Sequence, residues 1–217
     1  LMSFDSIQTM GAIQAQVDEI RKKYVGDPQF VNVPTDMITS KKFLSPYIER
    51  IKSGALDMNE ADADLEDDDN TTHFVIVDKN GMMVSCTNTL SNFFGSGVFV
   101  DGFFLNNKLT AFSAFRNSPN SPRPAKRSIT YTAPTIFTKD DRPILGIGAS
   151  GGSRITFMLS QVIMRHLFYN EPVQQAITEQ RFFTKKKVVY VEKELPSHVR
   201  TELQRNGYHV EVKPAGV

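Results

Sequence analysis

Apolar residues in the first 24 positions recur at intervals of three and four, the spacing of one helical face. They are Ile7, Met10, Ile13, Val17, Ile20 and Tyr24. Gly26-Asp27-Pro28 follows and predicts the end of this helix, because glycine and proline both interrupt helical backbone. A second, shorter helix is predicted over residues 41–52, with Ser40 as the cap at its start.

The segment over residues 57–70 is strongly acidic as far as Asp69. Such a run repels itself and lacks the apolar side chains that a core needs. We therefore interpret residues 57–70 as a solvated linker. It separates a helical region, residues 1–56, from a strand-rich region, residues 71–217.

Short runs of β-branched and aromatic residues dominate the chain after Thr71 and predict strands. These runs cover residues 74–77, 83–87, 103–105, 135–137 and 144–147. Asn80-Gly81 between the first two is a strong hairpin signal. A second turn is predicted at residues 139–143.

Helical and strand patterns alternate in the last third of the chain. Helices are predicted over residues 155–169, 173–180 and 197–206, and strands over residues 188–191 and 208–212. Strands first and helices outside them indicate a layered α+β domain.

Composition narrows the class of protein. The chain has 217 residues, 40% of them hydrophobic and 23% charged, with a net charge of +1, which is typical of a globular protein and indicates no nucleic acid partner. No run of about 18 apolar residues predicts a membrane span. Cys86 is the single cysteine and is expected to be a small packed core residue.

The beginning of the chain carries no basic-then-apolar leader. It starts inside the helical pattern of residues 4–24, so we expect it to be a piece of a longer protein. The missing leader therefore leaves the compartment open.

Thr71 begins the strand-rich region directly after Asn70. Cleavage between these two residues would leave a threonine with a free α-amine, and that amine can serve as the base for its hydroxyl. This is the chemistry of N-terminal nucleophile hydrolases. The alternative is that Thr71 and Thr72 are simply good strand formers.

The glycine-rich segment over residues 148–154 joins a predicted strand to a predicted helix. Glycines at such a position leave successive backbone N–H groups free to bind an anion or a developing oxyanion. The dinucleotide spacing and a Walker lysine are both absent. A tight strand–helix turn is the alternative, and the presence of a candidate threonine nucleophile in the same chain makes the oxyanion hole the preferred interpretation.

The four histidines lie at positions 73, 166, 198 and 209, and their spacing predicts no metal site. His73 either supports the site or packs, and packing is favoured, while His166 is expected to be structural. The basic segment at residues 123–127 either binds a carboxylate or forms a solvated loop face, which is the simpler interpretation.

Several segments in order resemble the γ-glutamyltransferases (γ-glutamyltranspeptidases), and together they cover nearly the whole chain. They are Gly26-Asp27-Pro28-Gln29-Phe30-Val31-Asn32-Val33-Pro34, Thr71-Thr72-His73-Phe74, Phe94-Gly95-Ser96-Gly97, Leu105-Asn106-Asn107, Ala133-Pro134-Thr135-Ile136 and Gly148-Ala149-Ser150-Gly151-Gly152-Ser153-Arg154-Ile155. Each motif alone is weak, but the set is specific.

The resemblance implies a precursor that cuts itself before a threonine into two subunits that stay together. It implies a four-layer αββα sandwich of the N-terminal nucleophile hydrolase type. Residues 1–70 would end the large subunit, and residues 71–217 would form most of the small one, without its C-terminal strands. The rest of the large subunit is then a partner of this chain.

The resemblance also assigns the catalytic groups. Thr71 is the nucleophile, Thr89 hydrogen-bonds it, and Gly151 and Gly152 form the oxyanion hole. Asn70 and Thr71 flank the processing site. Neither a metal nor a cofactor is implied.

The donor pocket departs from the family pattern. Ser91 stands where the family has an asparagine, and Lys108 stands where it has a glutamate or glutamine. Ala111 stands where the family has the aspartate that holds the substrate's α-amino group, and Thr130-Tyr131 stands where it has a Ser-Ser pair. An ammonium buried without its partner is costly, so we expect a free γ-glutamyl donor such as glutathione to bind poorly. The short loop at residues 113–123 would leave the site open to a bulkier donor.

The resemblance implies amide hydrolysis or transpeptidation through an acyl-enzyme, with a γ-glutamyl or related amide donor and water or an amine as acceptor. Two alternatives stay open: a related acylase or poly-γ-glutamate enzyme, and a non-catalytic family member. We expect the isolated 217-residue piece to be inactive, with self-association covering exposed sheet. Family members are often secreted, periplasmic or on the cell surface, and the sequence does not decide the compartment.

Overall fold

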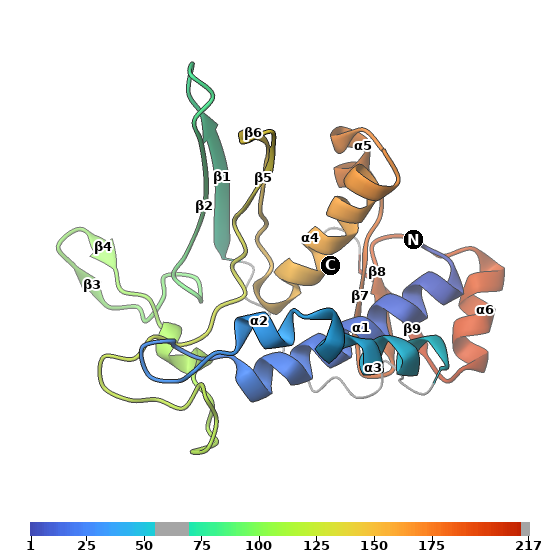
Figure 1. Ribbon diagram of the computed structural model, residues 1–217, viewed down its shortest axis with the longest axis horizontal. Helices are drawn as coiled ribbons and strands as arrows, with labels where there is room; N and C mark the ends of the chain where they lie inside the picture. Colours follow the sequence, from blue (N-terminus) through green and yellow to red (C-terminus); the bar gives the residue numbers. More distant parts are fainter. Residues whose placement is uncertain (55–69, 214–217) are drawn as a thin grey trace. The chain divides into compact units, whose positions relative to one another are not determined.

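The computed structural model describes residues 1–54 and 70–213 (Figure 1). The predicted acidic linker therefore lies outside the described residues, except for Asn70. The chain forms two compact units. Unit 1 comprises Leu1–Asp64, Ala111–Ile129 and Gln180–Val217, and unit 2 comprises Leu65–Thr110 and Thr130–Glu179.

The first predicted helix of unit 1 is confirmed as α1 (Phe4–Tyr24), capped by the Ser3 hydroxyl, which accepts from the Ser6 N–H. The predicted apolar face is wrong at Ile13 and Val17, which are 45% and 49% exposed. The helix instead buries positions that include small side chains, among them Ala12 and Ala15, because it packs against α3, α6 and β7.

The second predicted helix is confirmed as α3 (Lys41–Lys52), and the Ser40 hydroxyl accepts from the Phe43 N–H at 3.2 Å. The short helix α2 (Thr35–Ile38) before it was not predicted. Four residues are too few to leave a periodic pattern in the sequence.

The C-terminal part of unit 1 is a three-stranded sheet of order β7-β8-β9, from β7 (Phe182–Lys185), β8 (Val188–Val191) and β9 (His209–Val212). The strands β8 and β9 are parallel, and α6 (Ser197–Arg205) connects them. The predicted strands and helix of this region are confirmed, while β7 was missed. Its side chains are buried on both faces, so β7 shows no alternation.

The segment over residues 123–127 bears out part of each interpretation, because residues 123–125 and 127 are exposed, as in a solvated loop, while Arg127 also binds a carboxylate. The Asp27 side chain is fully buried and accepts from the backbone N–H of Arg127 at 2.8 Å and from its guanidinium at 3.2 Å. Lys126 is buried and donates to the carbonyls of Pro119 and Ser121. The basic segment thus binds a carboxylate, and this carboxylate belongs to the chain itself.

Unit 2 begins with an antiparallel hairpin of β1 (Thr71–Val77) and β2 (Met83–Thr89), at the position of the Asn80-Gly81 signal. Gly81 has a φ of +86°, a conformation that costs a glycine little. Cys86 on β2 is half-buried, so the prediction of a packed core position is too strong.

A second antiparallel hairpin pairs β5 (Thr135–Lys139) with β6 (Arg142–Ile147), which confirms the predicted turn at residues 139–143. The chain then passes through the short helix η3 (Gly152–Arg154) into α4 (Ile155–Ile163). A π-helical turn, η4 (Met164–Phe168), and α5 (Val173–Thr178) complete the unit. The core of this part joins Ile147 on β6 to α4 and α5 through Ile155, Leu159, Val162 and Ala176.

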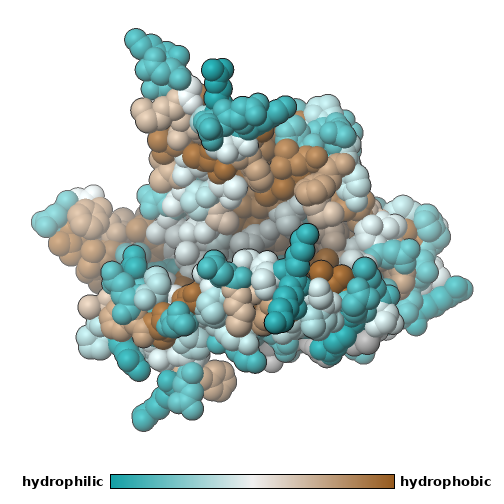
Figure 2. All heavy atoms as spheres, in the orientation of Figure 1, coloured by the Kyte–Doolittle hydropathy of each residue, from teal (hydrophilic) through white to brown (hydrophobic). Residues whose placement is uncertain are grey.

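A small hairpin of β3 (Phe99–Val100) and β4 (Phe103–Phe104) projects exposed aromatic side chains. Phe94 and Phe99 both contact the ring of Phe104, with centroids 4.9 and 5.0 Å apart. Figure 2 shows hydrophobic surface over this hairpin. The predicted strand at residues 103–105 is confirmed at Phe103 and Phe104, and its partner β3 was missed.

The protein is a mixture of helices and sheet, as the strand-then-helix pattern predicted. Backbone pairing within the described residues forms three two-stranded sheets and one three-stranded sheet. Among the helices of residues 1–54 and 70–213, none combines the length and the hydropathy that crossing a membrane requires.

Candidate active site

Thr71 and Thr89 are direct partners at the open end of the β1–β2 hairpin. Side chains alternate between the two faces of a strand, so the pairs Thr71–Thr89, His73–Thr87 and Val75–Ser85 all lie on one face. The candidate nucleophile and its predicted supporting threonine are therefore brought together by the register of the hairpin. Asn70, the other residue of the predicted processing site, precedes β1 and is half-buried.

Ser91 is held against Thr89. Its backbone N–H donates to the Thr89 hydroxyl at 2.9 Å, and the residue is buried with a φ of +71°. A positive φ is uncommon for a residue other than glycine, so this bend is maintained by its surroundings. The chain thus turns sharply immediately after the supporting threonine.

Lys108 begins the short helix η2 (Lys108–Ala111), on a loop that is hydrogen-bonded to the segment around Ser91. The Asn107 N–H donates to the carbonyl of Leu90 at 3.1 Å, and the Asn107 side chain accepts from the Asn92 N–H at 3.1 Å. The backbone N–H of Lys108 donates to Asn106. These bonds keep two of the predicted donor-binding residues, Ser91 and Lys108, on adjoining segments.

The glycine-rich turn after β6 has the backbone that an oxyanion hole needs. Gly151 has a φ of +124° and Gly152 a φ of +55°, and a Cβ added at Gly151 would meet no atom within 4 Å. The Gly151 carbonyl accepts from the Arg154 N–H at 3.0 Å. No backbone acceptor for the N–H groups of Gly151 and Gly152 occurs within the described parts of the chain.

The nucleophile face of β1 lies against β6 and the beginning of the glycine turn, and Figure 1 shows the two hairpins side by side. A Cβ at Gly146 would lie 2.7 Å from Cγ1 of Val75, and a Cβ at Gly148 would overlap the imidazole ring of His73. The Ser85 hydroxyl also donates to the carbonyl of Ile147 at 3.4 Å.

Sequence reasoning missed this contact, although alternating glycines in a strand signal a close approach of two segments. Gly146 and Gly148 carried that signal. His73 packs against Gly148, and the choice between packing alone and support of the site stays open at this point. Nδ1 of His166 donates to the carbonyl oxygen of Glu171 at 2.8 Å, and the structural role of His166 stays a prediction.

Thr130 and Tyr131, the remaining predicted donor-binding residues, lie in unit 2 just before β5. The Thr130 hydroxyl accepts from the Thr132 N–H at 3.1 Å. The assignment of Thr130 and Tyr131 to the donor pocket stays a prediction.

Metal-ligand geometry is lacking in the part of the chain that the structure describes: no group of three or more His, Cys, Asp or Glu side chains is arranged to hold an ion.

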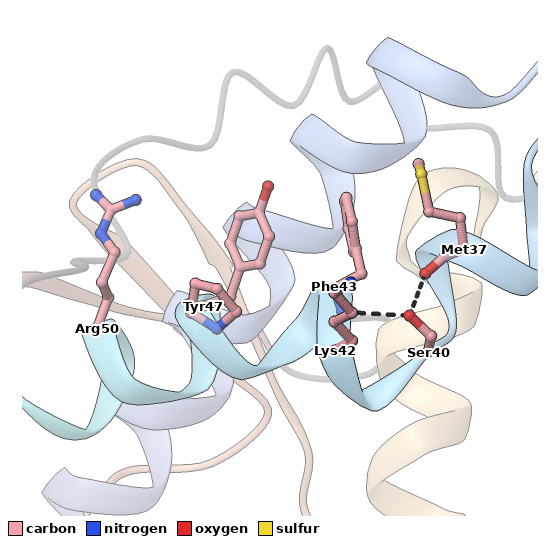
Figure 3. Close-up of a pocket in the computed structure, with 7 residues that line it drawn as sticks. Met37, Ser40, Lys42, Phe43, Tyr47 and Arg50 are labelled. Atoms are coloured by element: carbon pink, nitrogen blue, oxygen red, sulfur yellow. Dashed lines mark hydrogen bonds between the residues drawn. The ribbon is translucent and has the colours of Figure 1, made fainter.

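One pocket of about 660 Å³ lies in unit 1 and contains none of the candidate residues. Figure 3 shows that α3 and the residues just before it line this pocket. The Ser40 hydroxyl is already used there, since it donates to the Met37 carbonyl and accepts from the Phe43 N–H. The pocket is therefore distinct from the β1–β2 site.

Comparison with known proteins places these features in a family. The model of the γ-glutamyltranspeptidase family matches residues 3–217. The chain belongs to the γ-glutamyltranspeptidase family. This membership confirms the resemblance that the sequence motifs indicated.

Two relatives from bacilli illustrate the relationship. The chain is 42% identical over 193 residues to the capsule biosynthesis protein CapD proenzyme of Bacillus anthracis, covering 89% of this chain and 34% of that protein. It is 30% identical over 218 residues to the glutathione hydrolase proenzyme of Bacillus subtilis, covering 91% of this chain and 37% of that protein. The chain thus spans about a third of the length of the curated relatives it matches.

Solved structures are also similar to this chain. The transpeptidase CapD of Bacillus anthracis matches with a TM-score of 0.54 and 44% identity, over 65% of this chain and 78% of that chain. The γ-glutamyltranspeptidase of Pseudomonas nitroreducens complexed with L-DON matches with a TM-score of 0.61 and 34% identity, over 67% of this chain and 84% of that chain. A cephalosporin acylase from Bacillus halodurans matches with a TM-score of 0.74 and 27% identity, over 94% of this chain and 37% of that chain.

Proposed function

We propose that the protein containing this chain is a γ-glutamyl-type amide hydrolase and transpeptidase whose nucleophile is Thr71, released by cleavage after Asn70. The observation that carries the proposal is the pairing of Thr71 with Thr89 on the face of β1–β2 that meets the glycine turn. The enzymes among its relatives, glutathione hydrolases and a transpeptidase, support the same reaction class.

The packing of β1 on β6 indicates how the nucleophile faces the oxyanion donors. Val75 meets Gly146, and His73 meets Gly148, so a step of two along one segment matches a step of two along the other. One further step leads from His73 to Thr71 and from Gly148 to Ser150, which immediately precedes Gly151. The Thr71 hydroxyl would then point towards the N–H groups of Gly151 and Gly152.

The reaction follows from these groups. The free α-amine of Thr71 takes the hydroxyl proton as the oxygen attacks the donor's amide carbon, and the N–H groups of Gly151 and Gly152 stabilise the oxyanion. The leaving amine takes the proton as the C–N bond breaks, which leaves an ester on Thr71. Water or an acceptor amine then attacks that ester and frees the hydroxyl. The Thr89 hydroxyl donates to the nucleophile oxygen and orients it.

The length of the structural matches supports cleavage at this position. The solved transpeptidases match 65–67% of the chain, and residues 71–217 make up about two thirds of it. We infer that residues 1–70 belong to the large subunit, with residues 1–56 as its helical end and residues 57–70 as the linker to the processing site. Residues 71–217 belong to the small subunit, and the two together contribute to a four-layer αββα sandwich.

The donor pocket favours a substrate without a free α-amino group at the family's usual position. Lys108 and Ala111 stand at the two ends of η2, where the family has an acidic or amide residue and an aspartate. A poly-γ-glutamate chain or a glutaryl-type amide meets this requirement. The 42% identity to a capsule biosynthesis protein supports the polymeric donor as the second candidate.

The test uses the protein at the full length that its gene encodes. Intact mass after incubation should give two fragments, the smaller beginning at Thr71, and an acylating reagent should label that residue. Thr71→Ala is the matched control and should give neither result. A single uncut, unlabelled wild-type chain would contradict the proposal and favour a non-catalytic scaffold.

A further inference from the structure

His73 lies between two elements of the candidate site. Its Nδ1 is 2.9 Å from the hydroxyl of Thr87, its cross-strand partner, and its ring occupies the space where a Cβ on Gly148 would be. The three ring atoms nearest to that position are Nδ1, Cε1 and Cγ. The hydrogen bond to Thr87 therefore holds the ring in contact with Gly148.

The remaining ring nitrogen argues against a proton-transfer role. Nε2 of His73 is buried and has no hydrogen-bond partner in the described structure. A general base must lie within hydrogen-bond reach of the proton that it removes. Nδ1 is engaged by Thr87, and the α-amine of Thr71 is the proposed base, so the contribution considered for His73 is the volume of its ring.

The ring of His73 lies where the distance between β1 and the end of β6 affects the candidate site. His73 is two residues after Thr71 on the same face of β1, and Gly148 is three residues before Gly151. The thickness of the imidazole sets how closely the end of β6 approaches β1. Oxyanion donors stabilise a developing charge only when they lie close to hydrogen-bond distance from it.

We propose that His73 is a positioning residue: its imidazole ring is the spacer that sets the separation between the nucleophile strand β1 and the oxyanion turn at Gly151–Gly152. This inference rests on the proposed function of that site. It is distinct from ordinary packing, because a residue that only packs would affect stability without affecting the rate of the chemical step.

The experiment compares kcat and KM in the full-length protein, with γ-glutamyl-p-nitroanilide and a glutaryl anilide as donors. His73→Ala should lower kcat on the order of 10²-fold, since a displacement of about 1 Å can cost that much, while KM changes far less. His73→Asn keeps Cγ and an atom at the position of Nδ1. It should therefore retain most of the wild-type kcat.

A second test combines Gly148→Ala with His73→Ala. Gly148→Ala should lower kcat because its methyl group overlaps the imidazole ring. In the double variant with His73→Ala, the methyl group occupies space that the ring has left, so kcat should recover about tenfold over Gly148→Ala alone. If Gly148→Ala does not fold, the contrast between His73→Ala and His73→Asn carries the test by itself.

Val75→Ala is the matched control, because it truncates the next side chain on the same face, which contacts Gly146. It should lower the unfolding temperature and leave kcat nearly unchanged. A His73→Ala variant with the same pattern as Val75→Ala would overturn the inference. So would a His73→Asn variant as impaired as His73→Ala. Absence of cleavage and turnover in the wild type would instead overturn the proposed function, and the inference with it.

Discussion

Thr71 and Thr89 stand directly opposite each other across the antiparallel pair of β1 and β2. Opposed residues in such a pair have Cβ atoms roughly 4.5–5.5 Å apart, close enough for their hydroxyls to interact. The register of this hairpin therefore joins a candidate nucleophile to the group that would orient it. A shift by one residue would turn Thr89 to the opposite face.

Thr89→Val should lower the rate of Thr71 acylation on the order of 10²-fold, because valine keeps the shape of threonine and removes the hydroxyl. Thr89→Ser retains the hydroxyl and should stay within about tenfold of wild type. Single-turnover release of p-nitroaniline measures the acylation rate. Equal activity of the valine and serine variants would remove Thr89 from the site.

Gly151→Ala should impair both stability and catalysis. The φ of +124° is strained for alanine even though no atom lies within 4 Å of the added Cβ, so the cost arises from the backbone and is about 1–3 kcal/mol. The distorted N–H groups should lower kcat about 10²- to 10³-fold.

Gly81→Ala is the control for backbone strain, because Gly81 has a φ of +86°, equally open surroundings and a place in the β1–β2 turn. Thermal unfolding and kcat are measured for both variants. Gly81→Ala should lose stability and keep kcat. A Gly151→Ala variant that did the same would argue against an oxyanion role for that turn.

Ala111→Asp should shift donor preference towards a free γ-glutamyl group. It restores the carboxylate that the family uses for the substrate's α-amino group, and a hydrogen bond to a charged group is worth about 1.5–3 kcal/mol, roughly tenfold or more in relative kcat/KM. The measurement is the ratio of kcat/KM for γ-glutamyl- and glutaryl-p-nitroanilide, which differ in the α-amino group. Ala114→Asp adds the same charge nearby and should leave the ratio unchanged.

Unit 1 should lose stability in acid through Asp27. Its contacts with Arg127, the side-chain hydrogen bond first, lower the pKa of this carboxyl from 3.8 to about 2. A depressed pKa means that the ionised carboxylate stabilises the fold above about pH 4, and this contribution is lost as the pH falls from about 4 to about 2.

Asp27→Asn should therefore be less stable than wild type at about pH 7, and the difference should shrink towards about pH 2. Unfolding temperatures measured across this range test the prediction. Glu19→Gln, which removes an exposed carboxylate of α1, is the control. A constant difference in unfolding temperature between Asp27→Asn and wild type at every pH would contradict this prediction.

If the chain is cut after Asn70, Asp27 and Arg127 also link the two products.

Local signals were sufficient for much of the fold. Helical spacing, caps and turn residues lie within a few positions of one another in the sequence. They predict the bounds of α1 and α3, the β1–β2 hairpin and the α6–β9 segment. Thr71 and the glycine turn were recognised in the same way, because a hydroxyl residue at a boundary and a run of glycines are visible without a partner.

Contacts between distant residues were decided by the tertiary structure alone. Local periodicity does not specify which segment will pack on a given face of a helix. Helical spacing therefore placed Ile13 and Val17 on the buried face of α1, whereas both are exposed. The carboxylate that Arg127 binds could not be named from the sequence, because Asp27 lies 100 residues away. The spacing role inferred for His73 depends likewise on Gly148, a glycine that matters only once β6 has been packed against β1.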